Sequence, residues 1–173
     1  MTRLAAFVAA SLLLASPARA QLLDKKVMSL AEARKAAAAA VAEARKNGWA
    51  VVVAVVDDAG FLVTLDRIDG AQRASVDIAI GKARTAALFR RPSAALENAI
   101  DNVAVCTEHN REHTCEVKGR TALISVPGYA FLQGGMPVIV NGEVVGAVGA
   151  SGVKSEQDEQ VAKAGVDAIA PPR

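Results

Sequence analysis

The sequence predicts an α/β domain in which helices cover a central antiparallel sheet. Two β-branched segments joined by a tight turn, near 49–57 and 61–66, indicate one hairpin, and the Asn141-Gly142 dipeptide indicates another. Segments with helical spacing precede, separate and follow these strands. The chain has 173 residues, 52% hydrophobic and 22% charged, which suits one globular domain with a sizeable core.

The first helix is expected to begin after Ser29. Ser29 as N-cap and Glu32 three residues later form a capping-box pattern. An alanine-rich run follows, and Asn47-Gly48 gives a C-terminal stop. The next segment, Trp49–Asp57, is nearly continuous in β-branched residues, which predicts a strand buried on both faces.

The chain is then expected to turn at 58–60 and return as a strand over Phe61–Asp66. Helical spacing resumes over Ser75–Phe89 and is stopped by Arg90-Arg91-Pro92. A short helix is predicted near 93–100. The polar stretch 101–120, rich in Glu, His and Arg, is expected to be a loop.

The last third of the chain returns to strands and ends in a helix. Apolar runs at 121–126 and 136–140 predict strands, and the Asn141-Gly142 turn leads into another strand over 144–150. Ser155 and Asp158 form a second capping-box pattern, which predicts a final helix through Ile169.

Residues 1–20 are predicted to be a signal peptide. Arg3 gives the positive start, Leu4–Ala15 the apolar core, and Ala18-Arg19-Ala20 an A-x-A cleavage pattern. The apolar run is shorter than the roughly 20 residues that span a bilayer, and charges interrupt every later apolar run. We therefore expect a mature chain 21–173, a single domain without a membrane span, that is periplasmic or secreted and folds where thiols can oxidise.

The slight basic excess of the chain belongs to this leader. Arg3 and Arg19 account for the whole formal charge of +2, so residues 21–173 carry as many basic as acidic side chains. Aromatic residues make up only 3% of the sequence. The mature chain thus lacks the basic excess and the stacking rings of an electrostatic nucleic-acid binder, and no nucleic-acid partner is expected.

Several short phrases follow one another along the mature chain: Asp57–Gly60, Asp66–Ala71, Ser75–Phe89 with Lys82–Ala86 inside it, Gly134–Val138, and Asn141–Gly152 followed by Asp158. Taken in this order, they resemble the GlcG/HbpS family of haem-binding proteins. The resemblance implies a profilin-like α/β/α sandwich, homo-oligomeric assembly and, in some members, haem binding for sensing, protection or degradation. It identifies no sensor partner.

The chain departs from the family pattern at two places. Residues 105–117 form an insertion, and Tyr129-Ala130-Phe131 precedes the double glycine where members vary. The resemblance implies a haem pocket along the helix 75–89. Thr85 and Phe89 would then face an apolar slot, while Lys82 and Arg84, with Arg90 and Arg91, would supply positive charge for the propionates. The alternative is a solvated face of an amphipathic helix.

The insertion holds the two cysteines and two histidines of the sequence, Cys106, His109, His113 and Cys115. Three alternatives stay open. A Cys106–Cys115 disulfide would contribute about 2.7 kcal/mol on chain-entropy grounds. His109 or His113 could ligate haem iron, and their i, i+4 spacing would place them on one face of a helix. A Cys2His2 zinc site would need reduced thiols. Covalent c-type haem is excluded because no Cys-x-x-Cys-His occurs.

No catalytic constellation is recognisable in the sequence. The adjacent Asp57 and Asp58 suit turn capping, and the glycine-rich segments match no phosphate-binding loop. Residues 149–155 precede a helix and could offer free N–H groups to an anion. We therefore expect an exported protein that binds haem non-covalently in an aliphatic or subunit-interface slot. A binding module for a small carboxylate or other metabolite, and a haem-degrading enzyme, are the alternatives.

Overall fold

The computed structural model describes residues 24–101, 104–109, 112–117 and 125–170, so the predicted signal peptide lies outside the described residues. The helices and strands follow one another in the order expected for an α/β domain. They are α1 Leu30–Lys46, β1 Val52–Asp57, β2 Leu62–Arg67, α2 Ser75–Phe89, α3 Ala94–Asp101, β3 Ala104–His109, β4 Glu112–Val117, β5 Gly135–Val140, β6 Glu143–Ser151 and α4 Ser155–Ile169.

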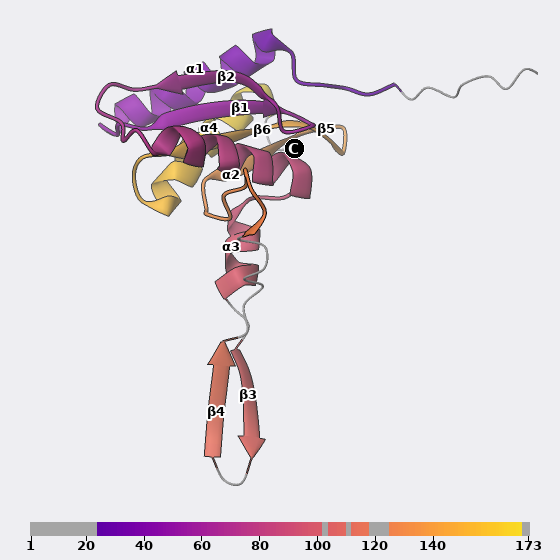
Figure 1. The fold of residues 1–173 in the computed structure, drawn as a ribbon. Helices are drawn as coiled ribbons and strands as arrows, with labels where there is room; N and C mark the ends of the chain where they lie inside the picture. The colour runs from indigo at the N-terminus through magenta and orange to yellow at the C-terminus, as the bar shows by residue number, and fades with distance from the viewer. Residues whose placement is uncertain (1–23, 102–103, 110–111, 118–124, 171–173) are drawn as a thin grey trace, which may run out of the picture.

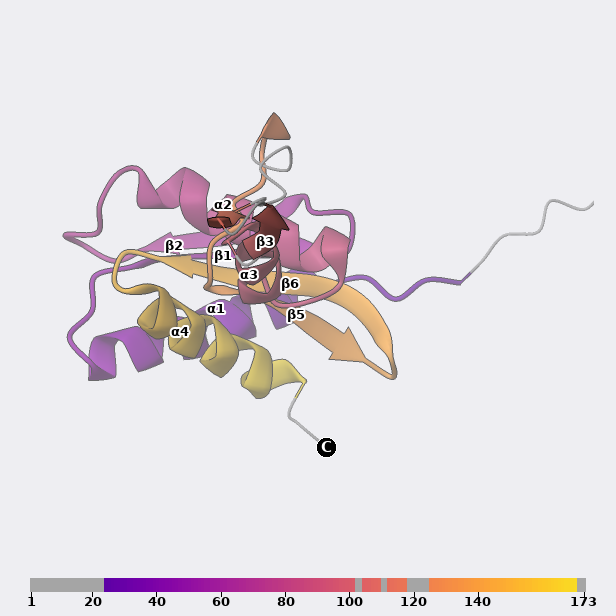
Figure 2. The ribbon, with the colours of Figure 1, turned by 90° about the horizontal axis from the view of Figure 1, so that it is seen from below.

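Four strands form an antiparallel sheet in the order β2-β1-β6-β5. Figure 2 shows α1 and α4 on one face of this sheet and α2 on the other. The predicted fold class, helices on both faces of a central antiparallel sheet, is confirmed.

The central strand β1 is buried on both faces, as the sequence predicts. Val51, Val53 and Val55 belong to the core beneath α1 and α4. The alternate residues of the same strand pack toward α2 with small residues of that helix. Side chains of a strand point alternately to its two faces, so a continuous apolar run is what a sheet covered by two helical layers requires. Alanine on α1 and α2 lets both helices lie close to the sheet.

The predicted caps and turns are confirmed at most positions. The Ser29 Oγ accepts a hydrogen bond from the Glu32 N–H at 3.2 Å and starts α1. The Asp57 carboxylate accepts from the N–H groups of Ala59 and Phe61, so it caps the β1–β2 turn. Asn141 and Gly142 have φ values of 54° and 85°, the left-handed conformation of a two-residue hairpin turn.

The stretch expected to be a loop near 101–120 contains a hairpin instead. β3 and β4 pair antiparallel from Ala104 opposite Val117 to His109 opposite Glu112, and Figure 1 shows this hairpin projecting away from the α/β body. Its threonines, valines and cysteines favour strands, whereas the polar composition had indicated a loop. Of the strand expected at 121–126, residues 121–124 lie outside the described part, and 125–126 are in a turn.

The second capping box predicted at Ser155 and Asp158 is also wrong. The N-cap of α4 is Lys154, whose N–H donates to the Gln157 side chain at 3.2 Å. Asp158 is buried instead, because its carboxylate has a different partner in the interior.

Candidate functional site

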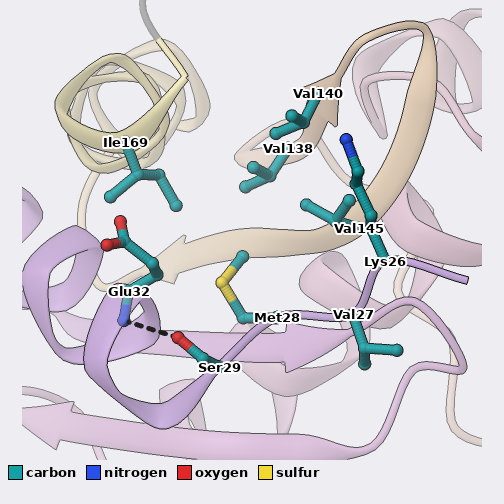
Figure 3. A pocket seen from close by; sticks show the side chains of 9 residues that line it. All are labelled: Lys26, Val27, Met28, Ser29, Glu32, Val138, Val140, Val145 and Ile169. Carbon is teal, nitrogen blue, oxygen red and sulfur yellow. Dashed lines mark hydrogen bonds between the residues drawn. The ribbon is translucent and has the colours of Figure 1, made fainter.

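An aliphatic pocket of about 320 Å³ opens between the N-terminal segment, β5, β6 and the end of α4 (Figure 3). Its walls are mostly branched aliphatic side chains, and three polar residues stand among them. The lining residues are Lys26, Val27, Met28, Ser29, Glu32, Val138, Val140, Val145 and Ile169. Ligand sites in proteins typically have this character, an apolar hollow with a few polar groups, and volumes of roughly 300–1,000 Å³.

Met28 is the residue that ties the N-terminal segment to the sheet. Its N–H donates to the Val145 carbonyl at 2.9 Å, and its side chain is buried. A Cβ at Gly146 would lie 3.0 Å from the Met28 methyl carbon, so glycine leaves the space that this side chain fills. In Figure 3 the thioether sulfur lies toward the pocket, below the valines of β5 and β6. The pocket thus contains one soft donor atom, a sulfur.

The charged border of the pocket continues into a second hollow. Lys26 also lines an adjoining pocket of about 310 Å³, together with Asp24, Lys25, Arg90, Gly142, Glu143 and Val144. Lys25 forms an ion pair with Asp58. A ligand with an apolar body and anionic groups would therefore meet aliphatic walls in the first pocket. In the second pocket it would meet the cations Lys26 and Arg90, with the carboxylates of Asp24 and Glu143 nearby.

Lys82, one of the residues expected to hold propionates, forms a buried ion pair. Its ammonium lies 2.7 Å from Asp158 Oδ2, and both side chains are only 3% exposed. The other oxygen of Asp158 accepts from the Val153 N–H at 3.2 Å. Burial raises the pKa of Asp158, and the hydrogen bond and charge of Lys82 act against that rise. Lys82 thus has an internal partner, and its predicted role toward haem propionates stays a prediction.

The double glycine makes room for this ion pair. A Cβ at Gly134 would lie 2.8 Å from Asp158 Cβ and 2.9 Å from the Lys82 ammonium, and the residue has a φ of 123°. At Gly135 a Cβ would lie 2.2 Å from the Lys82 carbonyl oxygen, so β5 can begin against α2 only without a side chain. The predicted structural role of these glycines is confirmed.

In the segment 149–155, which was expected to offer N–H groups to an external anion, a backbone N–H donates to a carboxylate of the protein itself. The Val153 N–H donates to Asp158, which belongs to the first turn of α4. The protein's own carboxylate therefore accepts from this turn, and the alternative of a small carboxylate ligand stays a prediction.

The other predicted residues of α2 also have internal partners. Thr85 is fully buried and its Oγ1 accepts from the Ala130 N–H at 3.2 Å. Arg84 donates to the carbonyls of Gly60 and Gly128, which joins the β1–β2 turn to the loop before β5. Phe89 packs edge-on against Tyr129, with ring centroids 5.7 Å apart.

Phe131 and the apolar residues of α3 complete this aromatic cluster. The structure brings Thr85, Arg84 and Phe89 together against the segment 128–131, which departs from the family pattern. Their role in haem binding stays a prediction.

The hairpin β3–β4 settles the relative placement of its cysteines and histidines. Cys106 lies directly opposite Cys115, a register compatible with the predicted disulfide, which stays a prediction. His113 is opposite Glu108, and His109 is opposite Glu112. These are consecutive pairs, and consecutive pairs of a ribbon belong to opposite faces. The segment is extended and not helical, so the condition under which the i, i+4 spacing would bring the two histidines to one face is not met. Ligation by these histidines, with or without the cysteines, stays a prediction.

The sequence predicts an aliphatic slot but does not locate this pocket. One signal was present, since Met28 directly precedes the N-cap of α1, where an apolar residue packs back on the helix as a hydrophobic staple. That pattern indicates packing but gives no sign that residues of β5, β6 and α4 converge there.

Among the residues whose side chains are described, no three metal-ligating side chains converge on a common point. No helix within the described ranges is both long and apolar enough to cross a membrane.

Comparison with known proteins assigns the chain to a family. Residues 28–167 match the family described as "Haem degrading protein HbpS-like". Protein GlcG of Escherichia coli is 40% identical over 127 residues, which are 73% of this chain and 83% of that protein. A double mutant of Streptomyces reticuli HbpS has a crystal structure similar to this one, with a TM-score of 0.70, 35% identity, and coverage of 90% of this chain and 97% of that chain.

A crystal structure of a PduOC–haem complex shares the fold as well. Its TM-score is 0.69 at 24% identity, and the match covers 83% of this chain and 95% of that chain. The order of the sequence phrases, the four-stranded antiparallel sheet between helices and these matches agree: the chain belongs to the GlcG/HbpS family.

Proposed function

We propose that this protein binds haem non-covalently in the aliphatic pocket between its N-terminal segment, β5, β6 and α4. The observation that carries the proposal is the combination in one place of an aliphatic hollow, a sulfur donor and an adjoining charged pocket that includes Lys26 and Arg90. Haem has the matching parts: an apolar macrocycle, an iron that accepts soft axial ligands, and two anionic propionates.

The residues present fit the cofactor by chemistry. Val138, Val140 and Ile169 would contact the macrocycle, and Lys26 with Arg90 would neutralise the propionates. The Met28 thioether would be the group that holds the iron, since methionine sulfur is a known haem-iron ligand. When bound, haem supplies an iron centre whose potential and reactivity depend on that ligand.

Family membership supports a function related to haem, since the matched family is described as haem degrading. The PduOC–haem complex shows that a protein of this fold can hold the cofactor. We further propose that residues 1–20 direct export and that the mature protein binds haem outside the cytoplasm as a homo-oligomer. These two points rest on the signal-peptide pattern and on the resemblance alone.

Haem titration of the mature chain 21–173 tests the proposal. We expect a Soret band that shifts and sharpens on binding at one haem per chain. Met28→Leu removes the sulfur at nearly constant volume, so it should change the visible bands while the protein stays folded. Thr85→Val is the matched variant at the other candidate location, on α2, and should leave the spectrum unchanged. A spectrum that responds to Thr85→Val and not to Met28→Leu would move the site to α2.

Charge reversal at Lys26 and Arg90 tests separately whether these two cations hold the propionates. The double change Lys26→Glu with Arg90→Glu should weaken haem binding by at least tenfold, because two propionate partners become repulsive. Arg73→Glu reverses an exposed charge outside both pockets and serves as the control. Equal haem affinities for the double variant and the Arg73→Glu control would contradict the assignment of Lys26 and Arg90 to the propionates.

Haem degradation is a second candidate function, favoured by the description of the matched family. It predicts that the bound haem loses its spectrum when peroxide is added, faster than free haem does under the same conditions. Protection of bound haem from peroxide would instead support binding without degradation.

A further inference from the structure

Arg90 adopts a backbone conformation that glycine usually supplies. It is the C-cap of α2, and its φ and ψ of 54° and 37° lie in the left-handed region. Every other positive φ among the described residues belongs to a glycine or to Asn141. Asparagine tolerates this region because its short side chain can hydrogen-bond locally, whereas the Cβ of an arginine there is strained. A glycine at this position would end the helix without that strain.

The side chain of Arg90 has no polar partner that would offset the strain. It is exposed, and it forms no hydrogen bond or ion pair with another residue in the described part of the chain. The neighbouring Arg91 already serves the end of the helix, because its Nε donates to the Phe89 carbonyl at 3.2 Å. The attraction between a cation and a helix C-terminus is therefore available without Arg90.

Arg90 instead lines the second pocket, the hollow of about 310 Å³. Lys26 lines both this pocket and the aliphatic one, and it too has no polar partner among the described residues. Asp24 and Glu143 also line the second pocket, but within the described ranges neither forms an ion pair with Arg90 or Lys26. Two unpaired cations from distant segments thus meet beside the aliphatic pocket.

We propose that Arg90 is a specificity residue, kept at a strained position because its guanidinium binds a free carboxylate of the ligand. Backbone strain concentrates at functional sites, where the side chain does work that the fold does not need. A guanidinium offers a carboxylate two parallel N–H donors, a geometry that a lysine ammonium lacks.

This inference rests on the proposed binding of haem at these pockets, and it names the group of the ligand that is recognised. The aliphatic pocket would accept the apolar body of the ligand. Arg90 would distinguish a free acid from the corresponding uncharged ester, at a cost in the stability of the protein without ligand.

Melting of the mature chain without ligand tests the strain. Arg90→Gly should raise the melting temperature by about 2 °C, because relief of the strain exceeds the greater entropy of unfolded glycine. Arg91→Ala removes the same charge together with the hydrogen bond to Phe89, so it should not raise the melting temperature. An Arg90→Gly variant that melts at or below the wild-type temperature would overturn the proposal.

Protoporphyrin IX, which lacks iron, tests the carboxylate without any contribution from the Met28 sulfur. In a fluorescence titration the wild type should bind the free acid about tenfold more tightly than the dimethyl ester. Arg90→Gly should lose most of this preference and Arg90→Lys should keep only part of it. Arg91→Ala, which lies outside both pockets, should keep all of it.

The outcomes separate this inference from the haem proposal. A wild type that binds protoporphyrin IX with a preference that Arg90→Gly leaves unchanged would overturn the role of Arg90 and leave the haem proposal standing. A preference that depends on Arg90, together with haem bands that Met28→Leu does not change, would contradict only the role of Met28. A wild type that binds neither porphyrin would contradict both proposals.

Discussion

The ammonium of Lys82 lies 2.7 Å from the Asp158 carboxylate, and this buried ion pair joins α2 to α4 across the end of the sheet. The two helices cover opposite faces of the sheet, so the pair fixes the two layers relative to each other. Gly134 leaves the space for it, and the Val153 N–H satisfies the second oxygen of Asp158. Two charges 76 positions apart in the sequence thus meet in the interior.

Removing one partner of this pair should be strongly destabilising. Lys82→Met leaves the Asp158 charge buried without compensation, and we expect a loss of about 3–5 kcal/mol in the free energy of unfolding. The double variant Lys82→Met with Asp158→Asn removes both charges and should recover much of that loss. Urea unfolding of the single and double variants measures the coupling. Additive losses would show that the two side chains do not interact.

The raised pKa of Asp158 predicts a pH dependence with a definite sign. Burial makes the folded chain hold a proton on this carboxyl more tightly than the unfolded chain does. The contribution of Asp158 to stability is therefore largest below its unfolded-state pKa and declines as pH rises through the higher folded-state pKa. The stability of the wild type relative to Asp158→Asn should fall across the range just above about pH 4 and then level off.

Glu43 should contribute to stability with the opposite pH dependence to that of Asp158. A hydrogen bond from Gln160, and then one from Asn47, lowers the pKa of this half-buried carboxyl. The contribution of Glu43 to the free energy of unfolding is present above its unfolded-state pKa and is lost as pH falls through the lower folded-state pKa. The stability of the wild type relative to Glu43→Gln should therefore rise with pH over this range, whereas its stability relative to Asp158→Asn should fall. A wild-type advantage over Asp158→Asn that grows with pH would contradict the raised pKa.

The close approach of β5 to α2 predicts that Gly135 tolerates no side chain. Gly135→Ala would place a Cβ 2.2 Å from the Lys82 carbonyl oxygen, so strand or helix must move. We expect a loss of more than about 3 kcal/mol, measured by urea unfolding. Gly142→Ala is the control, because it has open space and a φ of 85°, and should lose only about 1–2 kcal/mol from backbone strain. Similar losses of stability for Gly135→Ala and Gly142→Ala would contradict a tight contact between β5 and α2.

The projecting hairpin should be dispensable for folding of the body. Ala104 and Val117 are paired in the register, so a Gly-Gly link can replace residues 105–116 without separating the ends. We expect the melting temperature of the body and its haem affinity to stay unchanged. A melting temperature lowered by more than about 5 °C would show that the hairpin stabilises the body or an assembly of it.

The predicted Cys106–Cys115 disulfide should stabilise only the hairpin, because the hairpin projects from the body. Mass measurement of the mature protein with and without reductant detects a Cys106–Cys115 bond by the two hydrogens that reduction adds. Where the bond is present, reducing it should speed hydrogen exchange within 104–117, since an isolated ribbon is marginally stable, and should leave exchange in β1 and β6 unchanged. Faster exchange in the central strands on reduction would contradict a local role.

Local sequence patterns determined most of the fold of this protein. The Ser29 cap, the apolar run in β1, the Asn141-Gly142 turn and the stop after Phe89 act through neighbouring residues, and the structure confirms each of them. The ordered phrases that indicated the GlcG/HbpS family also depend only on the chain itself. The hairpin at 104–117 was missed because its polar composition concealed the alternation of its strands.

The candidate site depended on contacts between distant segments, and tertiary structure alone decided it. The sequence places Lys82 on a helix with amphipathic spacing, but folding buries it against Asp158. The same carboxylate accepts from the Val153 N–H, in the segment expected to bind an anion. The aliphatic pocket forms where Met28 meets residues of β5, β6 and α4. Helical and strand periodicity predict which face of an element is apolar, but only packing fixes which distant faces meet and where they leave a space.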